Sequence, residues 1–104
     1  MSETIYTAAF IFEPGEYDEE FYKLDAQIEE FAQSIDGYLK TERWNAREGN
    51  VKNSVYYFSS QEAIRTLATY EPHKVAKANY KKWYRGYRIE ISTVISSYGD
   101  GNLD

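Results

Sequence analysis

The sequence contains no cysteine, one histidine and two prolines. The absence of cysteine excludes disulfides, thiolate metal sites and cysteine nucleophiles. Because the acidic residues are not spaced as ligand pairs, we also expect no metal centre. No stretch approaches the roughly 18 apolar residues of a membrane span. The N-terminus lacks a basic segment followed by an apolar one, so we expect a cytoplasmic protein with no signal peptide and no membrane contact.

Glycines are few and scattered, and none opens a helix after a strand as phosphate loops and dinucleotide sites require. We therefore expect no cofactor. The net charge of −5 argues against nucleic-acid binding. Charge is unevenly placed, since residues 13–36 are strongly acidic and residues 73–88 carry only basic charges. The basic segment fits a solvated helix face, a funnel for an anionic ligand, or a partner for the acidic segment.

What the chain does have is aromatic residues, which make up 17% of its 104 residues and include eleven tyrosines. A chain of this length forms one domain, which we place at residues 1–104 with an ordered core of about 4–98. Each buried tyrosine brings a hydroxyl that needs a partner. A tyrosine-rich interior therefore indicates a pocket or an interface.

The hydrophobic pattern predicts alternating strands and helices. Residues 4–12 form a β-branched and aromatic run, typical of a strand covered on both faces. An apolar stripe from Tyr17 to Ile35 predicts a helix with Asp18 as its N-cap and Gly37 just after its end. Strands are expected at 38–45 and 51–58.

The second half of the chain predicts a broken helix and a final strand. Ser59 is the expected N-cap of a short helix, and Pro72 suits the first turn of a new helix that runs to about Tyr84. The last strand is expected at 87–98, followed by a tail. The order β-α-β-β-α-β is that of an α+β, ferredoxin-like fold with an antiparallel sheet. Since several strands are apolar on both faces, we expect a homodimer that packs sheet to sheet.

Candidate functional residues gather in the second half. His73 is the one side chain that titrates near neutral pH and fits a general base, or else a surface residue beside Pro72. Asn79 and Trp83 stand one helical turn apart and should share a helix face. Aromatic walls there would hold a flat ligand while Asn79 orients an oxygen, or the face is an aromatic core stripe with one satisfied amide. The further candidates for binding a small aromatic substrate are Trp44, Tyr57, Tyr80, Tyr87 and Arg88.

Three of these candidates have structural alternatives. Arg88 can pair with a carboxylate of the acidic helix or with an anionic phenolate. Trp44 and Tyr57 stand on neighbouring predicted strands. They can line the sheet side of a pocket or lie in the dimer seam.

A family resemblance covers most of the chain. Its motifs are residues 58–64, Phe-Ser-Ser-Gln-Glu-Ala-Ile, the pair Pro72-His73, and residues 82–84, Lys-Trp-Tyr, followed by Tyr87-Arg88. This pattern resembles the antibiotic biosynthesis monooxygenase (ABM) domain family. The resemblance implies a dimeric α+β barrel. It also implies a function among cofactor-free monooxygenases of phenols, haem-degrading relatives and members without known activity.

Two functions follow from the residues and the resemblance together. The first is a cofactor-independent monooxygenase that oxidises a small aromatic or quinol substrate with dioxygen, with His73, Asn79 and Trp83 as candidate catalytic residues. The alternative is a non-catalytic dimeric binding module for a small hydrophobic or haem-like ligand. In haem-degrading members, the positions of Leu67 and Lys77 hold a tryptophan and an axial histidine.

Overall fold

The structure is a computed structural model that describes residues 4–103. The chain runs through β1 (Ile5–Pro14), α1 (Glu19–Ser34), β2 (Tyr38–Asn45), β3 (Lys52–Phe58), α2 (Gln61–Ala68), α3 (Glu71–Ala78), a 3₁₀ turn (Tyr80–Lys82) and β4 (Tyr84–Val94). The expected ferredoxin-like order, with its second helix in two pieces, is confirmed. Within residues 4–103, no helix is long and apolar enough to cross a membrane.

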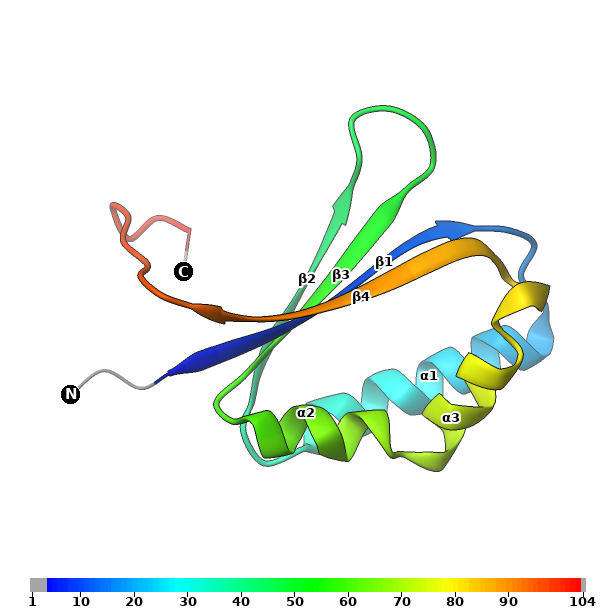
Figure 1. Cartoon of the computed structure of the whole chain (residues 1–104), viewed down its shortest axis with the longest axis horizontal. Coiled ribbons are helices and arrows are strands. Elements are labelled where there is room, and N and C mark those ends of the chain that lie inside the picture. Colours follow the sequence, from blue (N-terminus) through cyan, green and yellow to red (C-terminus); the bar gives the residue numbers. More distant parts are fainter. Residues whose placement is uncertain (1–3, 104) are drawn as a thin grey trace.

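The strands form one antiparallel sheet in the order β2-β3-β1-β4. The helices lie on one side of it (Figure 1). Since side chains alternate along a strand, Phe10, Tyr56 and Phe58 point to the helices. Ile11 and Val55 point to the opposite, open face.

The core lies between α1, α2 and the sheet. Its buried members are Ala32, Ile35, Phe58, Ala63 and Leu67. Asp18 caps α1 as expected, because its side chain accepts a hydrogen bond from the Phe21 N–H at 2.8 Å. Gly37 follows the helix with φ of 100°, which a side chain would strain.

The start of α2 corrects one expectation: the N-cap is Ser60 and not Ser59. The Ser60 hydroxyl accepts from the Ala63 N–H at 3.1 Å. The Ser59 N–H donates instead to the Gly37 carbonyl at 2.8 Å. Ser59 therefore belongs to the contact that joins the end of β3 to the end of α1, and the helix begins one residue later.

The expected helix to Tyr84 is also wrong, since α3 ends at Ala78 and β4 already begins at Tyr84. The Trp83 carbonyl accepts from the Gly15 N–H at 2.6 Å, which ties this segment to the end of β1. The last strand is accordingly shifted towards the N-terminus of its expected range. It ends at Val94 because Val94 pairs with Ile5, the first residue of β1.

Candidate functional site

A cavity of about 130 Å³ lies between the sheet and the helices. Its walls come from α1, from the end of α2, from α3 and from three strands. They are mostly apolar and aromatic. The lining residues are Ala8, Phe10, Asp25, Ile28, Tyr56, Leu67, His73, Ala76, Lys77, Tyr80, Tyr84, Tyr87 and Ile89. Tyr87 and Ile89 remain 40% and 42% exposed, so the cavity opens along β4.

His73 lies in the first turn of α3 and lines this cavity. Its Nδ1 lies 3.0 Å from the Leu67 carbonyl oxygen. A carbonyl only accepts, so the neutral ring carries its proton on Nδ1 and keeps the lone pair on Nε2. Burial lowers the pKa of His73, and the positive charge of Lys77 lowers it further, while the bond to Leu67 opposes both effects. His73 is therefore a neutral imidazole with a free basic nitrogen at neutral pH.

Further ionisable groups line the cavity. Lys77 follows His73 by one helical turn. Asp25 comes from α1, and its pKa is raised by desolvation and by the negative charge of Glu29, against the opposing charge of Arg43. Burial also raises the pKa of the Tyr84 phenol, which therefore stays protonated. The cavity thus combines a base, a cation and a carboxyl within aromatic walls.

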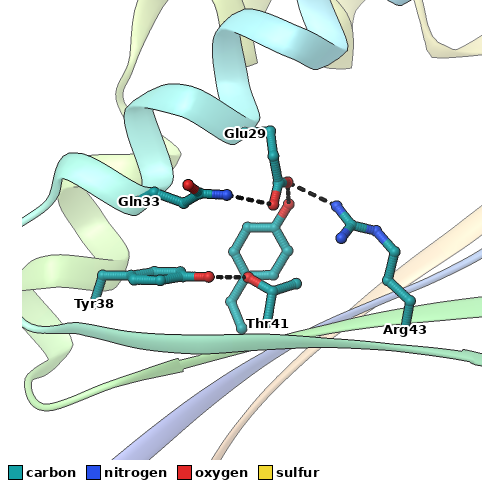
Figure 2. Close-up of polar contacts among 6 residues, drawn as sticks. Glu29, Gln33, Tyr38, Thr41 and Arg43 are labelled. Carbon is teal, nitrogen blue, oxygen red and sulfur yellow. Dashed lines mark hydrogen bonds and ion pairs between the residues drawn. The ribbon is translucent and has the colours of Figure 1, made fainter.

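A polar network holds α1 to β2 and β3. Glu29 accepts from Arg43 at 2.7 Å and from the Tyr56 hydroxyl at 2.9 Å. Figure 2 shows Gln33 and Arg43 reaching Glu29 from two sides, while Tyr38 contacts Thr41 below them. Burial and the charge of Glu29 raise the pKa of Tyr56 far above its usual value. Tyr56 is thus a fixed, protonated wall of the cavity.

Three of the expected residues meet in the cavity: His73, Tyr80 and Tyr87. The Tyr80 and Tyr87 rings pack edge to face, with centroids 4.8 Å apart. This pair joins the 3₁₀ turn to β4 in the cavity wall.

Asn79 and Trp83 do not line the cavity. The Asn79 amide donates to the Val75 carbonyl of its own helix at 2.8 Å. Trp83 is 1% exposed, and its indole N–H donates to the Asp18 carboxylate at 3.0 Å. The two residues do not share a helix face, because α3 ends at Ala78, before both of them.

Trp44, Tyr57 and Arg88 lie away from the cavity as well. The Tyr57 hydroxyl donates to Glu42 at 2.9 Å on the open face of the sheet, and Lys40 lies over its ring. Arg88 is 67% exposed and pairs with Glu90 at 3.4 Å. Trp44 is 58% exposed and lines a second groove that runs from the cavity towards the β2–β3 hairpin.

Sequence reasoning missed Asp25, Tyr56 and Tyr84 as cavity residues. A signal existed for Asp25, which follows Phe21 by one turn and precedes Ile28 by another, so that it interrupts the apolar stripe of α1. Tyr56 and Tyr84 carried no distinguishing signal among so many tyrosines. Their place depends on the register of β3 and on the early start of β4.

The buried His73 gives a pH-dependent stability. Its pKa is lower in the folded chain, so between the two values the unfolded chain binds more protons. The stability that the neutral His73 ring contributes is fully present above its pKa in the unfolded chain, near 6.5. This contribution is lost as the pH falls below that value. We expect the melting temperature to fall between pH 7.5 and pH 5.5, and this fall to shrink in His73→Gln. An unchanged slope in the variant would contradict the burial of a neutral ring.

Known structures resemble this fold, whereas no family model and no curated protein sequence matches the chain. A variant of SnoaB, a cofactor-independent oxygenase from Streptomyces nogalater, aligns over 92% of this chain and 97% of its own, with 12% identity and a TM-score of 0.71. A candidate antibiotic biosynthesis monooxygenase from Nitrosomonas europaea covers 95% of this chain and 98% of its own, at 8% identity and a TM-score of 0.68.

A DABB family protein from Mesorhizobium loti, described as ferredoxin-like, covers 90% of this chain and all of its own, with 9% identity and a TM-score of 0.63. At identities this low, the matches show a shared backbone fold only. The function of the cavity therefore has to be inferred from its own side chains. The chain therefore has the ferredoxin-like α+β fold found in proteins of the antibiotic biosynthesis monooxygenase and DABB groups.

Proposed function

We propose that this protein is a cofactor-independent monooxygenase that oxidises a small aromatic or quinol substrate with dioxygen. The observation that carries the proposal is the aromatic cavity in which His73 presents a neutral ring with a free Nε2. A general base works best with a pKa near the operating pH, and the lowered pKa of His73 keeps its ring unprotonated and able to accept a proton at neutral pH. The fold that the chain shares with SnoaB, a cofactor-independent oxygenase, also supports the proposal.

The reaction needs little from the protein. His73 Nε2 takes the proton of the substrate hydroxyl, and Lys77 stabilises the phenolate that forms. The electron-rich ring supplies the electrons to dioxygen. One oxygen atom enters the ring as a new carbon–oxygen bond, and the other leaves as water after the O–O bond breaks. For hydroquinone the balanced product is hydroxyquinone with one water.

The test is oxygen uptake by the purified protein, without added cofactor, across phenols and hydroquinones of one to three rings. Heat-denatured protein corrects for spontaneous oxidation. We expect uptake matched by product, with one labelled oxygen atom from ¹⁸O₂ in that product. A substrate that binds in the cavity but consumes no oxygen would contradict the proposal.

A binding module without turnover is the second candidate, and the position of Asn79 favours it. The amide expected to orient a substrate oxygen is bound within its own helix. A haem-like ligand is not favoured, because the cavity of about 130 Å³ lies below the several hundred Å³ of sites for larger ligands. Saturable binding of a small aromatic compound without oxygen uptake identifies this alternative.

We also propose that two copies pack through their open sheet faces. By register, that face carries Ile5, Ala9, Ile11 and Val55, and the helices lie on the opposite side. These side chains form an apolar strip along β1 and β3, flanked by polar residues such as Glu42 and Glu90. A strip of this kind is stabilised when a second sheet covers it.

Light scattering at micromolar concentration is expected to give the mass of a dimer. The variant Ile11→Glu places a charge in the centre of the open face and is expected to give a folded monomer, while Glu30→Gln on the outer side of α1 leaves the dimer intact. A monomer for the unmodified protein would refute this packing.

A further inference from the structure

Within residues 4–103, the carboxylate of Asp25 makes no hydrogen bond or ion pair with the protein. Among residues 4–103, the groups that influence it act through charge alone, with Glu29 repelling and Arg43 attracting. It nevertheless lines the aromatic cavity together with His73. Asp25 is exposed to solvent at the edge of the cavity. Water therefore solvates its carboxylate, and a ligand that displaces this water has to replace the hydrogen bonds that it made.

Glu29, in contrast to Asp25, has hydrogen-bond partners in the protein. The two acids stand one turn apart on α1. Glu29 takes the guanidinium of Arg43 at 2.7 Å and the Tyr56 hydroxyl at 2.9 Å. Arg43 and the Tyr56 hydroxyl are thus both engaged by Glu29, and the Asp25 carboxylate remains available to a ligand in the cavity.

Asp25 also stands at a junction. A second, wider groove of about 440 Å³ runs towards the β2–β3 hairpin and shares Phe10, Asp25, Tyr56 and Tyr84 with the aromatic cavity. A ligand ring in the cavity therefore meets His73 from α3 and Asp25 from α1. Both groups accept hydrogen bonds, one as a neutral imidazole and the other as a carboxylate.

The size of the cavity limits the ligand to one ring. An apolar protein cavity of about 150 Å³ is known to admit benzene, and this cavity measures about 130 Å³. Fused rings would have to extend through the opening along β4 or into the wider groove.

We propose that Asp25 determines specificity by selecting a single-ring phenol that carries a second hydrogen-bond donor. This inference rests on the proposed function for the hydroxyl that meets His73. The second donor, a hydroxyl on the same ring, binds the Asp25 carboxylate and supplies the partner that the fold withholds. A ring without that donor leaves the carboxylate desolvated and unpaired, so it binds more weakly.

The test compares hydroquinone with 4-methoxyphenol, which has a similar shape and lacks the second donor. Binding is measured without oxygen, by calorimetry or by ligand-observed NMR, so that turnover plays no part. We expect the unmodified protein to bind hydroquinone at least about tenfold more tightly. Asp25→Leu is expected to reduce this ratio to about one, with Asp25→Asn between the two.

Glu30→Gln is the matched control, because Glu30 is an exposed acid on the same helix, and it should keep the full ratio. Circular dichroism checks that each variant folds. Equal affinities in the unmodified protein, a ratio that survives in folded Asp25→Leu, or no binding of either compound would each overturn the proposal.

The outcome is separable from that of the proposed function. Discrimination by Asp25 without oxygen uptake would leave the specificity residue in place and refute the oxygenase. Oxygen uptake without discrimination would support the oxygenase and refute the role of Asp25 in specificity.

Discussion

Trp83→Ala is expected to destabilise the fold by about 3–5 kcal/mol, the usual loss when a buried tryptophan is truncated. Trp83 is 1% exposed and packs edge to face on Phe21, with ring centroids 5.5 Å apart. A domain of this size has a total stability of roughly 5–15 kcal/mol, so the loss is a large share of it. Thermal or urea unfolding measures it directly.

Trp83→Phe separates the two contributions of this residue. The smaller ring keeps most of the contact with Phe21 but removes the N–H that Asp18 accepts at 3.0 Å. We therefore expect a smaller loss than with alanine. Because Trp83 lies outside the cavity, the phenylalanine variant should bind ligands as the unmodified protein does. Lost binding in a folded Trp83→Phe protein would restore Trp83 as a site residue.

Trp83 also explains why part of the site could not be predicted from the sequence. Residues 72–84 have the composition of a helix, and on that basis Asn79 and Trp83 share a face. Two long-range hydrogen bonds instead hold Trp83 outside the helix. One runs from the Trp83 indole to Asp18, and the other from the Gly15 N–H to the Trp83 carbonyl. Local periodicity does not contain partners that lie some 65 residues away.

The order of the elements, by contrast, was predictable because it depends on local signals. The α1 stripe, its Asp18 cap and the glycine after it are all present as expected. The same holds for β2 and β3, whose ends follow from their turn residues. His73 was predictable as a candidate since it is the chain's single histidine, but the tautomer depends on the Leu67 carbonyl.

The uneven charge of the sequence has two structural outcomes. Lys82 pairs with Glu20 and Arg85 with Glu13, each at 3.7 Å, so part of the basic segment faces the acidic one. These pairs are exposed and contribute little to stability. Lys77 instead turns to the cavity, where a phenolate would meet its charge. The basic segment thus contributes Lys82 and Arg85 to surface ion pairs and Lys77 to the cavity.

His73→Gln is expected to lower the turnover number about 10²- to 10⁴-fold, the usual contribution of a general base. Glutamine keeps polar atoms near the Leu67 carbonyl but has no basic nitrogen to take the substrate proton. Steady-state oxygen uptake with a substrate identified in the panel gives the turnover number, and ligand affinity should change far less.

The control is Lys74→Gln, an exposed residue next to His73 on α3 that does not line the cavity. The pH profile adds a second readout. In the unmodified protein, turnover should fall at acidic pH with a midpoint below the ordinary histidine value, because burial lowers the pKa of His73. That acidic limb should vanish in His73→Gln. If the variant kept both its rate and the limb, the base would be a group other than His73.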